Sequence, residues 1–385
     1  MSEYGRSRAV LILNPSARFV VILSHMKKNS LKALVVYVAC VVLVVGGRGY
    51  AMSRMVGGVY PWLAFLFDAF ALLVLMGVLR GLDHIFQKAV RYGLDRRGWG
   101  KETRVQVARF AFILLFLLPF LLVTFQIHPQ RIATTQDPGD FNLPFEEVEL
   151  NSMGTILKGW YVPGARESGP VVLVTHGFGA NKQNFMYPVI LVHSMGLPAL
   201  IVDFRAHGDS GGAVTTFGLL ESHDIKTACD WLAKRHAGQP IYALSYSMGG
   251  AAVALAEAEY GLFDRIVIDS TFTSLRSIAQ ERFLRFFGPL DSFAWCQARL
   301  WAWFWAGVDL GDNSPEAAMH RFGGKPVLLI HGKSDSLIPY TETVRLKEIL
   351  GESAELWLID GAGHAETMHN SDYEARLRKF FGIEG

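Results

Sequence analysis

The stretch Leu244-Ser245-Tyr246-Ser247-Met248-Gly249-Gly250 decides the fold of this chain. It follows an apolar run at residues 241–244 that is typical of a buried strand, and an alanine-rich helical pattern comes directly after it. A serine on a sharp turn between a strand and a helix is the pattern of a nucleophile elbow, in which the residues two before and two after must be small. Ser245, where the pattern usually has glycine, and Gly249 meet that need. Ser247 is therefore the candidate nucleophile.

Two later motifs supply an acid and a base in a suitable order. Asp335 lies in the loop after a predicted strand at residues 326–330, and His364 follows the next predicted strand. The order Ser247, Asp335, His364 differs from that of chymotrypsin-type and subtilisin-type enzymes. Asp269 also follows an apolar run and could supply the carboxylate instead.

A glycine-rich turn at His176-Gly177-Phe178-Gly179 follows an earlier apolar strand pattern. With the other motifs it resembles the α/β-hydrolase superfamily, in particular the branch that groups monoglyceride lipases, S33-type aminopeptidases and membrane-anchored Bem46-like hydrolases. The resemblance covers roughly residues 145–381. It implies an α/β fold, a mostly parallel sheet with helices on both faces and a helical cap.

The expected roles follow the chemistry of a serine hydrolase. Ser247 attacks, His364 acts as base and then as acid, and Asp335 holds the imidazole. The resemblance favours Asp335 over Asp269, because Asp335-x-x-Ile-Pro matches the acid loop of the family. The backbone N–H groups of Phe178 and Met248 are the candidate oxyanion hole. This chemistry needs no metal and no organic cofactor.

The loop at residues 203–211 departs from the usual family form, because Ala206 and His207 stand inside it. We expect this change to alter the rim of the pocket and leave the mechanism intact. Asp203 and Arg205 are expected to pair with each other and hold the loop. His176 and His207 are expected to shape loops, since neither follows the last strand.

Composition limits the classes of protein that need to be considered. A chain of 385 residues suggests two structural units. A net charge of +2 gives no reason to expect a nucleic-acid partner. Its 3 cysteines are too few and too scattered for a disulfide framework or a zinc site. Hydrophobic residues make up 51% of the chain and are concentrated near its beginning.

The first part of the chain is predicted to be a membrane region with three transmembrane helices. Three apolar stretches approach the length of about 20 residues that spans a bilayer, at residues 31–45, 59–79 and 105–125. Core helices of a soluble domain are the alternative interpretation. The expected organisation is a tail at 1–30, a membrane region at 31–127, a linker at 128–143 and a hydrolase domain at 144–385.

Loop charges predict the orientation of these spans. Between the second and third spans, lysine and arginine outnumber acidic residues, whereas the first loop has only Arg48 and Arg54. Because positive loops stay in the cytoplasm, the hydrolase domain is expected outside a multi-pass cell-membrane region. The first span could instead be a cleaved signal peptide, and residues before Met26 could be an over-extended start or a tail.

An insert at residues 275–322, rich in phenylalanine and tryptophan, is the expected cap. It either packs on itself and on the core, or forms an apolar acyl pocket or a face that rests on the bilayer. The leading hypothesis is a membrane-anchored serine hydrolase acting on small-molecule or lipid acyl esters. A peptidase or amidase, with Glu221, Asp224 or Glu281 recognising an amine, and a non-catalytic membrane-associated binding protein are the alternatives.

Overall fold

The computed structural model describes residue 103, residues 106–107, residues 118–166 and residues 168–383. The expected tail, the first two expected spans and most of the third therefore lie outside the described residues. Among the described residues, no helix is both long enough and apolar enough to cross a membrane. The last part of the third expected span is α5 (Leu118–Ile127).

A sheet of eight strands forms the centre of the hydrolase domain, in the order β1-β2-β4-β3-β5-β6-β7-β8. The first two strands form the antiparallel hairpin that the alternating sequence predicts, β2 is also antiparallel to β4, and the other neighbours are parallel. The strands are β1 (Glu146–Ser152), β2 (Thr155–Val162), β3 (Val171–Thr175), β4 (Ala199–Val202), β5 (Ile241–Tyr246), β6 (Arg265–Asp269), β7 (Val327–Gly332) and β8 (Ala354–Ile359).

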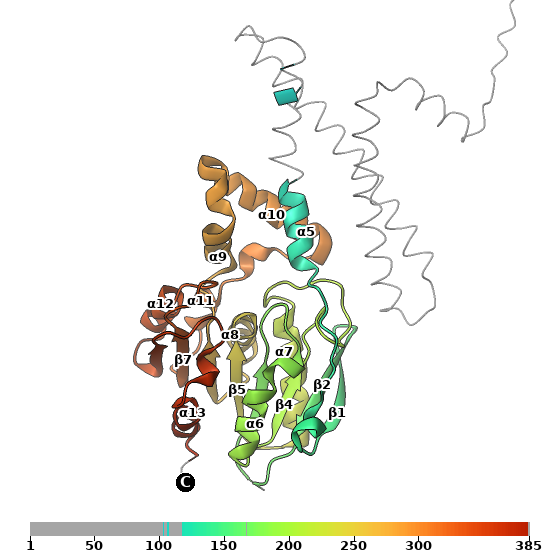
Figure 1. Cartoon of the computed structure of the whole chain (residues 1–385), viewed down its shortest axis with the longest axis vertical. Helices are drawn as coiled ribbons and strands as arrows, with labels where there is room; N and C mark the ends of the chain where they lie inside the picture. The colour runs from blue at the N-terminus through green and yellow to red at the C-terminus, as the bar shows by residue number, and fades with distance from the viewer. Residues whose placement is uncertain (1–102, 104–105, 108–117, 167, 384–385) are drawn as a thin grey trace, which may run out of the picture. The chain divides into compact units, whose positions relative to one another are not determined.

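Helices cover both faces of this sheet (Figure 1). Strands β3, β4, β5 and β7 are buried along their whole length, as expected of parallel strands between two helical layers. One face packs against α6 (Met186–Ser194) and α13 (Tyr373–Phe381). The other packs against α7 (Glu221–Arg235), α8 (Met248–Tyr260), α11 (Pro315–Met319) and α12 (Thr341–Leu350).

The two parts of the insert between β6 and β7 pack against different parts of the domain. Its first part, α9 (Leu275–Arg282), the 3₁₀ turn η4 (Leu284–Leu290) and α10 (Asp291–Ala306), packs in a separate apolar cluster to which α5 also contributes. These elements gather at one end of the domain, beyond the sheet (Figure 1). The last part, α11, joins the core against α8. The cap is thus the α9–α10 part of the insert with α5 beside it.

Candidate active site

Ser247 occupies a strained turn between β5 and α8. Its φ of 52° and ψ of −118° are rare for a residue other than glycine, and such backbone geometry costs about 1–3 kcal/mol. The turn requires Gly249, because a Cβ there would overlap Thr175 Oγ1 and lie 2.8 Å from the carbonyl oxygen of His176. The sharp turn lifts the serine out of the strand at the carboxyl edge of the sheet.

Ser245 fits where the elbow usually has glycine because its hydroxyl finds a partner. Ser245 Oγ is buried and donates to the carbonyl oxygen of Val267 on the neighbouring strand at 2.6 Å. The backbone N–H of Ser247 donates to the carbonyl oxygen of Asp269 at 2.8 Å. Two bonds to β6 therefore fix the elbow in place.

The structure brings Ser247, His364 and Asp335 into one hydrogen-bonded series. His364 Nε2 lies 3.0 Å from Ser247 Oγ, and His364 Nδ1 lies 2.7 Å from Asp335 Oδ2. Because a carboxylate can only accept, it favours the tautomer with the proton on Nδ1, which leaves the Nε2 lone pair facing the serine hydroxyl. This arrangement can remove the serine proton.

Asp335 is held as an anion by its neighbours. Burial alone would raise the pKa of this carboxyl, but hydrogen bonds from His331 and His364 and from the backbone hold the pKa well below its usual range. Oδ1 accepts the N–H groups of Leu337 and Ile338, each at 2.8 Å. The carboxylate is thus charged and fixed at neutral pH.

His331 also belongs to this arrangement, although no role is predicted for it from the sequence. Its Nε2 lies 3.1 Å from Asp335 Oδ2 and 2.9 Å from the carbonyl oxygen of Ile338, so Nε2 carries the proton. Its Nδ1 lies 2.6 Å from Thr343 Oγ1 on α12. The available sequence signal was a histidine near the end of a buried strand, four residues before the acid.

Asp269, the alternative acid, is not the hydrogen-bond partner of His364, whose two ring nitrogens face Asp335 and Ser247. The carboxyl group of Asp269 accepts from Thr367 Oγ1 and from Ser270 Oγ, the latter at 2.8 Å, and Tyr373 Oη lies 3.4 Å away. Burial raises the pKa of Asp269 to about 6. It is a buried carboxyl beneath the site, bonded to hydroxyl groups.

The backbone around Phe178 and Met248 is positioned to bind an oxyanion. A Cβ on Gly177 would lie 3.2 Å from Ser247 Cβ, so the turn that carries Phe178 passes directly beside the serine. Met248 begins α8, whose N-terminal end favours negative charge. Neither N–H has an acceptor within the part of the chain that the structure describes. Both donors are available to a ligand.

The loop at residues 203–211 differs from the prediction in its ion pairs. Asp203 pairs with Lys182 at 2.7 Å, and Arg205 pairs with Asp224 of α7 at 2.6 Å, so the predicted Asp203–Arg205 pair is wrong. Each side chain finds an opposite charge on another segment that the fold brings close. None of residues 203–211 lines the cavity, but His207 packs edge-on against Phe178, which does, with 5.9 Å between ring centroids.

The two other histidines shape loops, as expected. His176 Nδ1 donates to the carbonyl oxygen of Gly177 at 2.7 Å, and its Nε2 accepts the N–H of Phe204 at 3.0 Å. Burial lowers the pKa of His176 to about 3, which keeps the ring neutral. His207 Nδ1 donates to the carbonyl oxygen of Arg205 at 2.9 Å.

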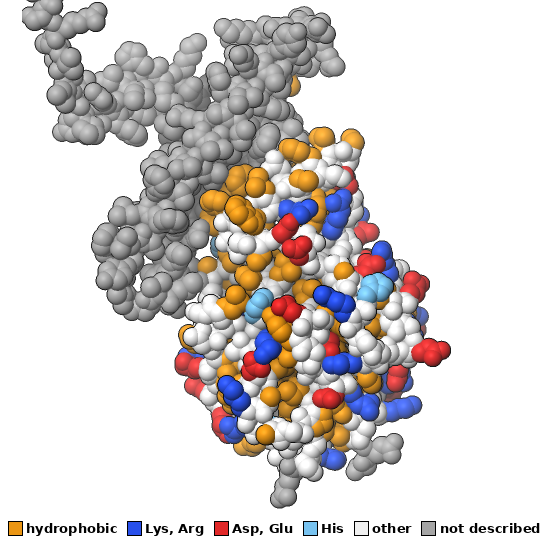
Figure 2. Space-filling model, turned by 180° about the vertical axis from the view of Figure 1, so that it is seen from behind, with side chains coloured by type: hydrophobic (Ala, Val, Ile, Leu, Met, Phe, Trp, Pro, Cys, Tyr) orange, Lys and Arg blue, Asp and Glu red, His pale blue; other side chains and the backbone are white. Residues whose placement is uncertain are grey.

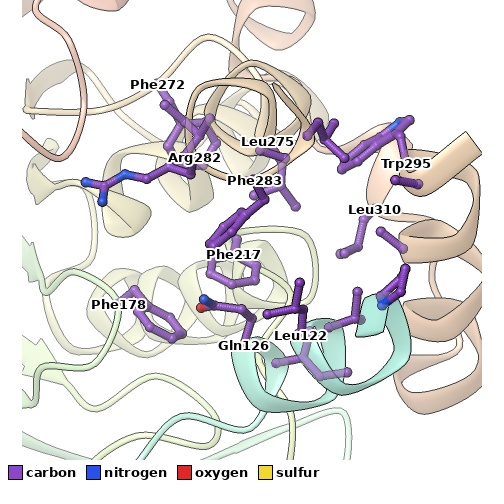
Figure 3. Close-up of a pocket in the computed structure, with 18 of the residues that line it drawn as sticks. Leu122, Gln126, Phe178, Phe217, Phe272, Leu275, Arg282, Phe283, Trp295 and Leu310 are labelled. Atoms are coloured by element: carbon purple, nitrogen blue, oxygen red, sulfur yellow. The ribbon is translucent and has the colours of Figure 1, made fainter. Parts of the chain in front are cut away.

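Beside Ser247 lies an apolar cavity of about 300 Å³. Its walls come from α5, α9, η4 and α10, with Phe178 and Phe217 stacked at 5.0 Å between their ring centroids. Figure 3 shows Leu122 and Gln126 of α5 opposite Leu275 and Phe283 of the cap. Apart from Ser247, Gln126 and Arg282 are the polar side chains of this lining. The site can therefore hold an apolar group next to the serine.

Comparison with known proteins agrees with this geometry. A model of the alpha/beta hydrolase family matches residues 171–378. The chain belongs to this family. The Pyrococcus furiosus esterase Pf2001 is similar in structure, with a TM-score of 0.54 and 25% identity, over 67% of this alpha/beta hydrolase and 98% of the esterase.

Two relatives illustrate the sequence identity and the share of the chain over which similarity extends. YqkD of Bacillus subtilis, an uncharacterised protein, is 26% identical over 61% of this alpha/beta hydrolase and 80% of its own length. The lysophosphatidylserine lipase ABHD12 of Danio rerio is 26% identical over 51% of each chain. Family and structural neighbours together identify a hydrolase of the esterase type.

Proposed function

We propose that this protein is a membrane-anchored serine hydrolase that cleaves carboxylic esters with an apolar acyl chain. The observation that carries the proposal is the series Ser247–His364–Asp335 at the wall of an apolar cavity. Ser247 Oγ attacks the ester carbonyl carbon as its proton passes to His364 Nε2. The N–H groups of Phe178 and Met248 bind the developing oxyanion.

The alcohol then leaves with the proton from His364, and the acyl group stays on Ser247. Water attacks this acyl-enzyme with His364 again as base, which releases the carboxylic acid and restores the serine hydroxyl. Asp335 keeps the imidazole in the required tautomer and stabilises the imidazolium that forms twice in each cycle.

An ester fits the surroundings better than a peptide with a free amine. The acids suggested for amine recognition are already engaged, because Glu221 accepts from Thr215 and Thr216 and Asp224 pairs with Arg205. Glu281 of α9 lies 3.6 Å from Arg285 of η4. The lipid lipase among the relatives supports an acyl ester as the substrate class.

The membrane part of the proposal rests on the sequence and on the surface of the cap. The predicted spans precede the hydrolase domain, which we place on the extracytoplasmic side because of the loop charges. On α10, Leu300, Trp303 and Phe304 are exposed. Figure 2 shows hydrophobic side chains gathered at the cap end of the described surface. Tryptophan and phenylalanine are favoured where a protein meets a bilayer.

The test is fluorophosphonate labelling of intact cells with one membrane-permeant and one impermeant probe. Wild type and a Ser292→Ala control, which changes an exposed serine of the cap, should be labelled by both probes. Ser247→Ala should lose the label. Labelling of Ser247→Ala would overturn the nucleophile, and labelling by the permeant probe alone would overturn the proposed side of the membrane.

A further inference from the structure

One wall of the cavity comes from outside the part of the chain that matches the family. The matched residues begin at position 171, whereas α5 ends at Ile127, before the first strand. This helix nevertheless contributes five lining residues, Pro119, Leu122, Val123, Gln126 and Ile127. The hydrolase fold alone therefore leaves the cavity open on this side.

Contacts at both ends fix α5 in place. Phe120 packs edge-on against Trp301 of α10, with 4.9 Å between ring centroids, and Thr124 Oγ1 accepts from Trp305 Nε1 at 2.9 Å. At the other end, the carbonyl oxygen of Ile127 accepts the N–H of Thr215 at 2.9 Å. Because the helix is bonded to both the cap and the body of the domain, it forms a fixed wall.

The cavity has a nucleophile end and a distal part along this wall. Gln126 lies beside Phe178, whose turn touches Ser247, and Leu122 lies farther along α5 (Figure 3). One helical turn separates them, which is about 6 Å. An acyl chain attached to Ser247 would pass Gln126 before it reaches Leu122.

The volume of the cavity limits the chain that fits. Its volume of about 300 Å³ is many times the roughly 10–15 Å³ that one water molecule needs, so several methylene groups of an acyl chain fit. The lining around Leu122 is apolar, so each additional buried methylene group should raise kcat/KM about fourfold until the space is filled.

We propose that α5 selects the acyl chain length, with Leu122 as the specificity-determining residue. The inference rests on the proposed esterase function of Ser247. Leu122→Ala widens the distal part of the cavity by about three methylene groups, whereas Leu122→Trp narrows it. The kcat/KM for esters of long acyl chains should rise in Leu122→Ala and fall in Leu122→Trp.

The experiment measures kcat/KM of the full-length chain for p-nitrophenyl acetate, octanoate and tetradecanoate in one detergent. In Leu122→Ala the tetradecanoate-to-octanoate ratio should rise at least tenfold, and in Leu122→Trp it should fall at least tenfold. Phe125→Ala is the matched control, because Phe125 is on the same helix, is 80% exposed and does not line the cavity. Its ratio should equal that of the wild type.

Each outcome separates this inference from the proposed function. If the acetate is hydrolysed normally and both Leu122 variants keep the wild-type ratio, α5 does not select the chain. A change in Phe125→Ala equal to that in Leu122→Ala would show a general effect of the helix and would also overturn the inference. If wild type hydrolyses no ester, or Ser247→Ala keeps the activity, the proposed function itself fails.

Discussion

Replacing Asp335 with asparagine tests the role of the negative charge of this side chain in the site. The carboxylate accepts four N–H donors, from His364 at 2.7 Å, His331 at 3.1 Å, and Leu337 and Ile338 at 2.8 Å each. An asparagine amide must turn its NH₂ group toward one of these two pairs. Facing the histidines, it would favour the His364 tautomer with the proton on Nε2, which cannot accept the serine proton.

The loss can be estimated for both rate and stability. An imidazole in the wrong tautomer lowers kcat by about 10⁴ in a Ser-His-Asp enzyme. A hydrogen bond to a charged group contributes about 1.5–3 kcal/mol. With the changed tautomer His364 Nδ1 can accept from the amide, whereas His331 Nε2 still carries its proton and becomes a contact between donors. The loss of this one bond should lower the free energy of unfolding by about 1.5–3 kcal/mol.

The assay combines hydrolysis of p-nitrophenyl acetate with urea unfolding of the same preparation. Asp360→Asn is the matched control, because Asp360 pairs with Lys333 at 2.8 Å but its side chain is 86% exposed. The control should retain its rate and its stability, since an exposed pair contributes about 0–1 kcal/mol. If Asp335→Asn hydrolyses the ester within tenfold of wild type, the assignment of the acid is refuted and Asp269 becomes the next residue to change.

Three further changes test the fold around the site. Gly249→Ala should lower the free energy of unfolding measured in urea by about 3 kcal/mol or more, because the new Cβ overlaps Thr175 Oγ1; a stability within 1 kcal/mol of wild type would contradict the clash. Ala206→Gly should raise the melting temperature and add about 1 kcal/mol, because Ala206 has a φ of 63° that glycine adopts freely; an unchanged Tm would contradict the strain. Burial raises the pKa of Asp269 to about 6, so the folded chain keeps a proton that the unfolded chain loses near pH 4. Stability should therefore fall by about 3 kcal/mol as pH rises from 4 through 6. In Asp269→Asn, the free energy of unfolding measured in urea should no longer fall between pH 4 and pH 7. An equal fall in that variant would show that another group causes the pH dependence.

Some features of the site were predictable because their requirements are local. The elbow needs small residues at fixed positions beside Ser247, and the loop after each strand must carry the acid and the histidine, so the sequence pattern alone indicates them. The antiparallel β1–β2 hairpin likewise follows from alternation around a short turn. The structure adds that Ser247, His364 and Asp335 lie within hydrogen-bonding distance.

Other features depend on partners far apart in the chain. Arg205 and Asp203 lie two residues apart, which suggested a pair, but each binds a charge on another segment because the fold brings Asp224 and Lys182 closer. His331 contacts Asp335 only because the loop after β7 turns back over the end of that strand. Hydrogen bonds and ion pairs between distant segments produce no periodic pattern in the sequence.

The sequence by itself determined the family, the strand and helix pattern and the residues of the nucleophile elbow, since steric and hydrophobic requirements repeat at short spacing. Only the tertiary structure decided that α5, which the sequence had assigned to a membrane span, lines the cavity beside Ser247. An apolar helix satisfies a bilayer and a protein interior equally well, because both exclude water. The contacts of Phe120 and Thr124 with α10 decide where the end of this helix lies.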